Sequence, residues 1–309
     1  MSRRLTFTVT ADYDGKKVAH FLRGSARFSA RLVTLLKRQE DGIMLNGRPA
    51  RTVDPIKEGD SLVLNLPADS ALPEPKYYPL QILFEDEDVL VVNKPGTLAM
   101  HPSRKHQGVT LANAVARHLQ NSQKESVFRA IGRLDKGTSG AVVCALNRFA
   151  AARLTGHVEK EYLALVHGEF SGEGAIDLPV YRPDAMKILR ACGPEGEPAL
   201  TRWSSLGCAG GMSLLSVRLE TGRTHQIRVH FSHLGAPLAG DDMYGAPDTG
   251  LGRQMLHCCS AAFEHPVTGH RLTITAPLPP DMREFLAGLG LPKSEFPHPV
   301  VGYNAQEST

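Results

Sequence analysis

Apolar positions in the first part of the chain recur at spacings that predict a small α+β unit. Leucines repeat at helical intervals within 30–37, which predicts a short helix. The run 43–48 predicts a strand that enters a tight turn, and a later turn leads into a second strand at 61–66. We therefore expect an N-terminal domain over residues 1–66.

Short apolar runs dominate the chain after residue 80. The runs of strand length lie at 82–92, 161–166, 212–219 and 272–276. Helical patterns punctuate them, as at 111–119, and no repeat of fixed period is present. Many short strands with interspersed helices predict an α+β domain built on a mixed, largely antiparallel sheet, which we place at 80–292.

Two stretches lack regular apolar patterning. Residues 67–79 contain several prolines and predict a semi-extended linker. Because of those prolines, we expect few contacts across the boundary between the two domains. The residues at 293–309 contain proline and serine and predict a loosely ordered tail.

Composition excludes several classes of protein. Hydrophobic residues make up 42% and charged residues 22% of the chain, as in ordinary soluble globular proteins. No stretch approaches the roughly 20 apolar residues that cross a bilayer, and no apolar run follows the N-terminal arginines, so we expect neither a membrane span nor a signal peptide. Five cysteines without a CxxC pair predict neither a disulfide framework nor a zinc site, and favour a cytoplasmic location.

Charge is distributed unevenly along the chain. Residues 1–66 contain 12 Lys and Arg against 7 Asp and Glu, whereas the remainder contains 23 against 25. The basic surplus therefore lies at the N-terminal end. Such asymmetry favours an arm that faces an anionic partner, attached to a nearly neutral body.

One stretch of small residues places a carboxylate between two cations. Within 132–140, Asp135 lies between Arg133 and Lys136, and an apolar strand predicted at 141–146 follows. Backbone groups and cations can hold a carboxylate in such a turn, while a substrate can still reach it.

This stretch resembles the catalytic motif of the RluA family of pseudouridine synthases, which isomerise uridine within RNA. Three further segments resemble the family in the same order, at 160–166, 223–244 and 255–266. Gly132 and Asn147 depart from the family pattern, in which His and Lys are frequent. The resemblance implies an RNA-modifying isomerase with the α+β catalytic domain of that family.

By this resemblance, Asp135 is the catalytic carboxylate, and no cofactor is implied because the isomerisation neither gains nor loses atoms. A carboxylate in a water-poor pocket tends to take up a proton unless an opposite charge lies within about 4–6 Å. The resemblance assigns that charge to Arg223, in a loop before a helix that we expect to begin with Thr224 as its cap and to end at Gly235. It also implies that Tyr162 faces the uracil, with a ring for stacking and a hydroxyl for proton movement.

The resemblance further implies RNA contacts around this site and in the N-terminal unit, whose element order resembles the S4 RNA-binding domain. The expected contact residues are Arg133, Thr138, His225, Gln226, Arg228, Leu256, Arg27 and Arg31. His225, His230 and His233 are separated by five and three positions and do not give the i, i+4 pair of a helical zinc site, so we expect no metal.

The expected partner is a structured RNA, ribosomal rather than transfer RNA, and the chain is expected to act as a monomer. The target uridine would be flipped out of its stack, because the rearrangement cannot occur inside a helix. Two alternatives stay open. One is a catalytically silent RNA-binding protein on the same fold, and the other is a carbohydrate- or nucleotide-acting hydrolase, which would need a second acidic partner for Asp135.

Overall fold

A computed structural model describes residues 3–66, 73–102, 108–122, 127–247 and 249–291. The predicted tail at 293–309 and the first half of the predicted linker, 67–72, lie outside the described residues. No helix in the described ranges is long and apolar enough to span a bilayer.

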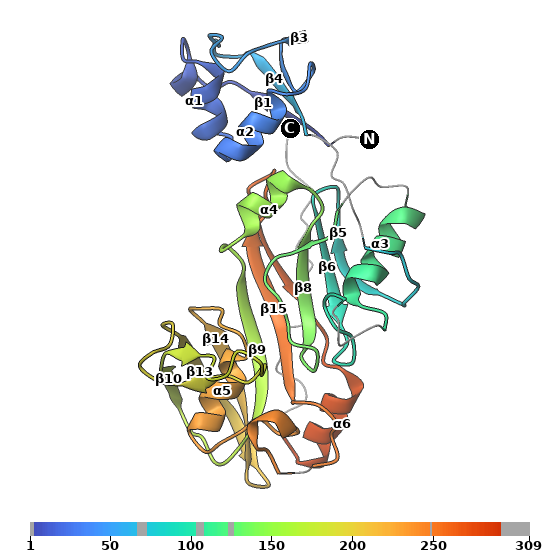
Figure 1. Cartoon of the computed structure of the whole chain (residues 1–309), viewed down its shortest axis with the longest axis vertical. Helices are drawn as coiled ribbons and strands as arrows, with labels where there is room; N and C mark the ends of the chain where they lie inside the picture. Colours follow the sequence, from blue (N-terminus) through green and yellow to red (C-terminus); the bar gives the residue numbers. More distant parts are fainter. Residues whose placement is uncertain (1–2, 67–72, 103–107, 123–126, 248, 292–309) are drawn as a thin grey trace.

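The N-terminal unit packs two short helices and a 3₁₀ turn against an antiparallel sheet (Figure 1). Its helical elements are η1 (Ala11–Tyr13), α1 (Val18–Arg23) and α2 (Ala30–Leu36). Its strands are β1 (Arg4–Thr8), β2 (Ile43–Leu45), β3 (Arg48–Pro49) and β4 (Ser61–Asn65), in the order β1-β4-β2-β3. The Ser29 hydroxyl accepts from Leu32 N–H and caps α2. The predicted helix and both predicted strands are confirmed.

A mixed sheet forms the larger domain, and the α+β fold class is confirmed. Its path is β10 (Glu173–Asp177), β13 (Leu200–Ala209), β14 (Met212–Leu219), β9 (Glu159–His167), β15 (Leu256–Glu264), β8 (Ser139–Ala145), β6 (Val89–Lys94) and β5 (Gln81–Glu85). Off this path, β7 (Arg129–Ala130) pairs with β8, and β16 (Arg271–Thr275) pairs with β15. Every pairing is antiparallel except that of β15 with β8.

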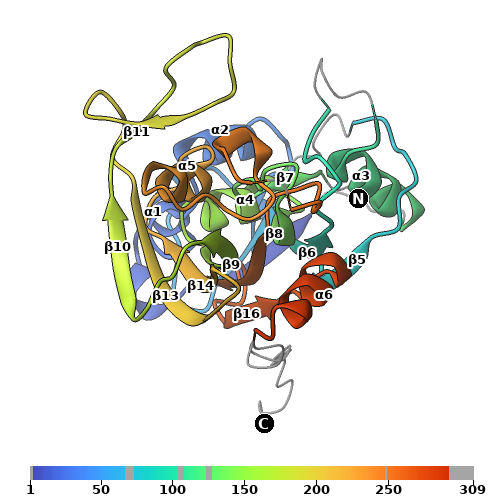
Figure 2. The ribbon, with the colours of Figure 1, turned by 90° about the horizontal axis from the view of Figure 1, so that it is seen from below.

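Helices surround this sheet at its ends and faces (Figures 1 and 2). They are α3 (Leu111–Asn121), α4 (Arg148–Leu154), α5 (Gln226–His233), the 3₁₀ turn η2 (Asp242–Tyr244) and α6 (Pro280–Gly288). A small hairpin of β11 (Val180–Tyr181) and β12 (Ala191–Cys192) projects from the body beside β10 (Figure 2).

The central strand β8 is buried at all seven positions. At its start, Gly140 has φ +112°, and a Cβ at this position would collide with the Cys258 carbonyl oxygen on β15. Glycine therefore permits the close approach of these two strands. The turn that carries Asp135 ends where β8 begins, so this close pairing fixes the base of the candidate site.

The described residues of the two units meet at a small number of contacts, and no strand of one unit pairs with a strand of the other. Phe149 on α4 is 1% exposed and belongs to the apolar core of the N-terminal unit, where its ring centroid lies 4.7 Å from that of Phe28. Arg3 Nε and Nη2 donate to the Asp88 carboxylate at 3.0 and 2.7 Å. An aromatic side chain and a buried carboxylate, which the linker composition does not reveal, thus form the junction between the units.

The described part of the predicted linker, 73–79, contains no helix or strand. It lies against α3, because Lys76 N–H donates to the Asn113 carbonyl at 3.2 Å and Asn113 Nδ2 donates to the Glu74 carbonyl at 2.8 Å. This segment is therefore attached to the catalytic domain.

Candidate active site

The carboxylate of Asp135 lies in the turn that leads into β8. The Thr138 N–H donates to the Asp135 carbonyl at 3.1 Å and closes this turn. The fully buried Lys94 ammonium holds the next peptide group, because Nζ donates to the Lys136 carbonyl at 3.3 Å and to the Leu98 carbonyl at 2.8 Å. Burial lowers the pKa of Lys94 to about 7. Sequence reasoning missed this lysine.

The cation beside Asp135 is Arg228, on the first turn of α5. Its Nη1 donates to Asp135 Oδ2 at 3.3 Å, while Nε and Nη2 donate to the Asp241 carboxylate at 2.6 and 2.8 Å. Burial opposes its charge, but the hydrogen bonds and charges of the two aspartates outweigh that effect and raise the pKa of Arg228. Arg228 is therefore a fixed cation that bridges Asp241 and Asp135.

The expected pairing of Arg223 with Asp135 was wrong. The Arg223 guanidinium pairs with Glu197, and its Nε donates to the Pro198 carbonyl at 3.0 Å. Arg223 lies in the loop before α5 and its side chain extends toward 197–198, whereas Arg228 lies within the helix. The helix, rather than the loop, supplies the charge.

The start of α5 also differs from the expectation. The cap position is occupied by His225, which has a left-handed backbone with φ +58°, and not by Thr224. Gln226 holds the loop instead, because its Oε1 accepts from Arg223 N–H and from the Thr221 hydroxyl, both at 2.9 Å. The end of the helix matches the prediction, since Gly235 follows the last turn with φ +73°.

His225 presents a defined ring nitrogen to Asp135. The Tyr244 hydroxyl accepts from Arg190 N–H at 3.0 Å and lies 2.9 Å from His225 Nδ1. Nε2 lies 3.8 Å from Asp135 Oδ2. Burial lowers the pKa of His225, so the ring is neutral at neutral pH.

Tyr162 and Leu256 complete a narrow pocket around Asp135. Both line the pocket together with Leu219 and Ile227. Tyr162, Leu256 and Ile227 are at least nine-tenths buried, and Leu219 is partly buried. Burial raises the pKa of Tyr162 well above its usual range, so the phenol stays protonated. The site therefore offers one carboxylate, a fixed cation, a phenol and an apolar wall.

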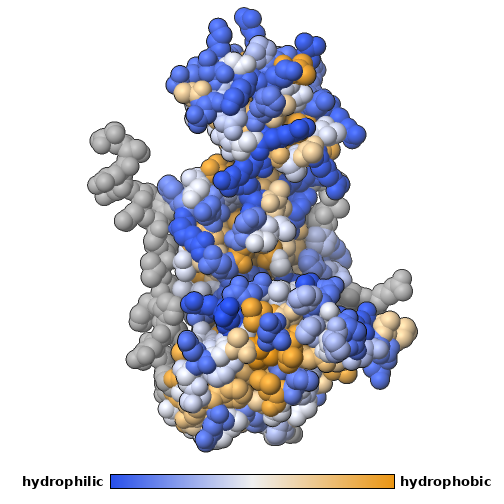
Figure 3. Space-filling model, turned by 90° about the vertical axis from the view of Figure 1, so that its left-hand side faces the viewer, coloured by the Kyte–Doolittle hydropathy of each residue, from blue (hydrophilic) through white to orange (hydrophobic). Residues whose placement is uncertain are grey.

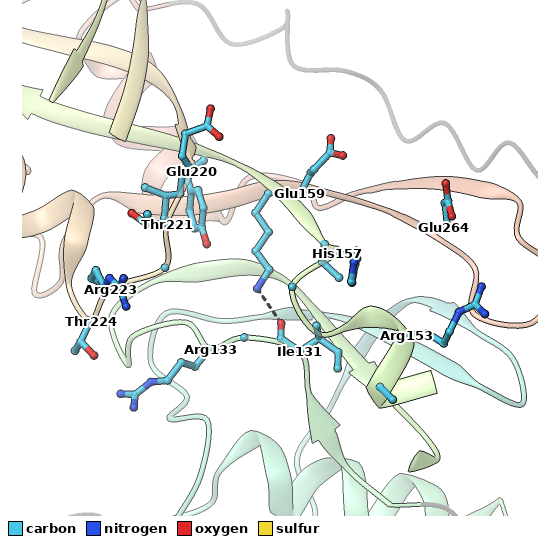
Figure 4. A pocket seen from close by; sticks show the side chains of 18 of the residues that line it. Ile131, Arg133, Arg153, His157, Glu159, Glu220, Thr221, Arg223, Thr224 and Glu264 are labelled. Carbon is cyan, nitrogen blue, oxygen red and sulfur yellow. Dashed lines mark hydrogen bonds between the residues drawn. The ribbon is translucent and has the colours of Figure 1, made fainter. Parts of the chain in front are cut away.

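The other predicted contact residues lie in three different surroundings. Thr138 and Gln226 are buried, and their side chains are hydrogen-bonded inside the protein, to Gln254 and to Thr201 and Leu200 respectively. Arg133 and Arg27 line a larger cavity of about 1030 Å³ that also reaches Asp135. Figure 4 shows Arg133 and Arg223 on one side of this cavity and Arg153 on the other. Arg31 is exposed on α2 and does not line it.

The described residues contain one group with the spacing of metal ligands, made of Asp86, Asp88 and His265. Asp88 accepts from Arg3 and from Asn147 Nδ2, and Asp86 lies 2.7 Å from His265 Nε2. Both carboxylates are therefore already paired with side chains of the protein. The cluster lies at the junction of the two units, away from Asp135.

The chain belongs to the RNA pseudouridine synthases, a family of isomerases, and its mixed sheet has the fold of that family. Residues 88–233 match the family model for RNA pseudouridylate synthase. The uncharacterized RNA pseudouridine synthase YjbO of Bacillus subtilis (strain 168) is 38% identical over 276 residues, which cover 86% of this chain and 96% of that protein.

Other similar proteins agree with this assignment. Ribosomal large subunit pseudouridine synthase D of Xanthomonas campestris pv. campestris is 34% identical over 80% of both chains. Among solved structures, human RNA pseudouridylate synthase domain containing 1 is 29% identical with a TM-score of 0.53, covering 68% of this chain and 89% of that one. The family assignment thus rests on sequence and on fold.

Proposed function

We propose that this protein converts specific uridines of a structured RNA into pseudouridine with Asp135 as the catalytic carboxylate. The observation that carries the proposal is the carboxylate's position, 3.3 Å from the buried cation Arg228 and in one pocket with Tyr162 and Leu256. Arg228 thus places a fixed positive charge beside this carboxylate.

The reaction breaks the C1′–N1 bond of uridine, turns the uracil and joins C1′ to C5, while a proton leaves C5 and one is gained at N1. Asp135 is the one carboxylate of the narrow pocket. Three roles fit its position: attack on the base, attack on C1′, or removal of a sugar proton. Tyr162 supplies a ring face to the detached uracil, and Leu256 supplies an apolar floor. His225 places its ring nitrogen Nε2 3.8 Å from the carboxylate oxygen Oδ2 of Asp135.

We propose ribosomal RNA of the large subunit as the substrate, in preference to transfer RNA. Several similar proteins, including the one from Xanthomonas campestris, are named for action on the large ribosomal subunit. The basic N-terminal unit, which resembles an S4 domain, would add sequence-independent affinity for the RNA backbone. A monomeric state and a cytoplasmic location stay predictions.

A hydrolase using Asp135 would need a second carboxylic acid as proton donor. Asp241, which shares Arg228 with Asp135, accepts from that guanidinium with both oxygens and is fully buried. It is therefore engaged as an ion-pair partner, which favours the isomerase over the hydrolase.

The direct test is tritium release from RNA that carries 5-³H-uridine. Large-subunit ribosomal RNA and transfer RNA, each transcribed in vitro without modification, are incubated with the full chain. We expect release from the ribosomal RNA. Tritium release from transfer RNA alone would make transfer RNA the substrate in place of ribosomal RNA. Release from neither RNA would favour a catalytically silent RNA-binding protein.

A further inference from the structure

The larger cavity contains two arginines that neither the fold nor the chemistry at Asp135 explains. Arg27 comes from the N-terminal unit and Arg153 from α4 of the catalytic domain, and both line this cavity. We propose that Arg27 and Arg153 together form a binding site for the RNA phosphodiester backbone that spans the two units. This inference rests on the proposed function and adds where the RNA beyond the target uridine would bind.

The two arginines line the same cavity, and in the part of the chain that the structure describes neither is held in an ion pair with a carboxylate. Among the described residues, neither guanidinium group forms an ion pair or a hydrogen bond, although Glu264 lines the same cavity. Burial lowers the pKa of Arg153, the positive charge of Arg27 lowers it further, and Glu264 only partly offsets them. An anion bound between the two guanidinium groups would relieve this repulsion.

An aromatic contact sets the spacing of the pair. Arg27 directly precedes Phe28, whose ring packs against Phe149, and the Arg153 guanidinium lies 5.7 Å from the centroid of the same Phe149 ring. Each arginine is thereby tied to one side of the junction between the units. The junction therefore brings the backbone positions of both arginines to one cavity before any ligand binds, and the Phe149 ring supports the Arg153 guanidinium.

The backbone of Arg27 supports a role for its side chain. Its φ is +52°, in the left-handed region that favours glycine. A long charged side chain at this position is kept at an energetic cost to the fold, and such costs concentrate at ligand sites.

The position of the cavity favours RNA as the ligand. The same cavity reaches Asp135, Tyr162 and Arg133, so a strand whose uridine occupies the narrow pocket would pass along the cavity wall. Guanidinium groups match phosphate oxygens in a bidentate geometry. Hydrophilic side chains also gather over the N-terminal unit on the face shown in Figure 3.

The test measures the affinity of the full chain for unmodified large-subunit ribosomal RNA transcribed in vitro, over a range of salt concentrations. The variants are Arg27→Gln, Arg153→Gln and the double variant, and the matched controls are Arg51→Gln and Arg117→Gln. Both control arginines are exposed and lie outside the cavity, on the N-terminal unit and on α3. We expect roughly tenfold weaker binding for each single variant.

Salt dependence identifies the kind of contact. Each lost phosphate contact should reduce the slope of log affinity against log salt by about 0.7 to 0.9, and the double variant by about twice that. Replacing both arginines by lysine keeps the charges and should restore most of the slope. Arg27→Gly removes the side chain and accommodates the positive φ, so it separates loss of binding from loss of folding.

Three outcomes would overturn the proposal. They are an unchanged affinity in the double variant, a loss of affinity with an unchanged salt slope, and a loss equal to that of the two controls. The proposal would also be overturned if polyglutamate displaced RNA from the wild type at similar concentration, because that would indicate an acidic protein as partner. RNA binding can be measured whether or not the protein isomerises uridine. If the variants showed these changes in affinity but the wild type formed no pseudouridine, the proposed function would be contradicted and the proposed phosphate site would not.

Discussion

Arg228 Nη1 lies 3.3 Å from Asp135 Oδ2, and the two residues are 93 positions apart in the sequence. The contact joins the turn before β8 to the first turn of α5, and Asp241 fixes the other side of the guanidinium. The charge at the site therefore depends on three segments of the chain, and this dependence underlies the predictions that follow.

Asp135→Asn should abolish pseudouridine formation while RNA affinity and folding stay close to the wild type. The amide keeps the volume of the carboxylate but removes its charge, which carries the chemistry. We expect turnover to fall by about 10³-fold or more, measured by tritium release at saturating RNA. Asp135→Ala should give the same loss. Substantial turnover in the asparagine variant would contradict the role of the carboxylate.

Arg228→Gln should lose both activity and stability, whereas Arg223→Gln should lose much less of either. Removing Arg228 leaves Asp241 buried without its partner, at a cost of about 3–5 kcal/mol, because Arg228 is only 6% exposed and Asp241 is fully buried. Urea unfolding measures this cost. Combining Arg228→Gln with Asp241→Asn should recover stability but not turnover. A larger loss of turnover in the Arg223 variant would reverse the assignment of the cation.

Tyr162→Phe should lower turnover roughly tenfold at saturating RNA, through loss of one hydrogen bond, with little change in RNA affinity. Tyr162→Leu should cost more, because it also removes the ring face. Because burial raises the pKa of Tyr162, its phenol stays protonated through the accessible alkaline range. The turnover of the wild type should therefore not decline near pH 10 through ionisation of this phenol. A decline near pH 10 that is present in the wild type and absent in Tyr162→Phe would contradict a buried neutral phenol.

The folded protein should lose stability as pH falls from about 6.5 to about 4, because of His257. Burial lowers the pKa of this wholly buried histidine from 6.5 to about 4. Between these values the unfolded chain binds the proton and the folded chain does not, so the free energy of unfolding decreases by about 3 kcal/mol and then levels off. Urea unfolding at a series of pH values measures the slope. His257→Gln should flatten it, and an unchanged slope would assign the acid sensitivity to other groups.

Removing residues 1–66 should reduce the solubility of the remaining chain. The truncation exposes Phe149 and leaves the buried Asp88 without Arg3. Adding Phe149→Ser to the truncated chain should recover part of the solubility, which sedimentation after expression measures. Equal solubility of the two truncated chains would show that this aromatic contact contributes little.

The sequence predicted those parts of the molecule that local patterns determine. The apolar run at 212–219 coincides with β14, and the motif around Asp135 and the strand that carries Tyr162 meet in one pocket. The prediction that Arg223 is the cation beside Asp135 was wrong, because the position of each arginine relative to Asp135 depends on where α5 begins. That start is set by the left-handed backbone of His225, which no apolar period reveals.

Contacts between distant segments were equally inaccessible from the sequence. Arg228 meets Asp241 and Phe28 meets Phe149 only because the sheet and α4 bring them together. In the sequence, Asp241 is visible only as one of two adjacent aspartates in a segment that resembles the RluA family, and Phe149 only as a single phenylalanine in a short helix. Neither indicates a partner, since packing and not composition decides which side chains meet.

The parallel pairing of β8 with β15 has a consequence for the order of events during synthesis. His257 pairs with Ser139, 118 positions earlier, and its Nδ1 lies 2.9 Å from the Ser139 hydroxyl. The strand that follows the catalytic turn thus lacks one neighbour until most of the chain has left the ribosome. Closing so long a loop is slow, and until it closes, the apolar edge of β8 stays open to other chains. The base of the candidate site can therefore form only after residues 257 and 258 have been synthesised and have reached β8.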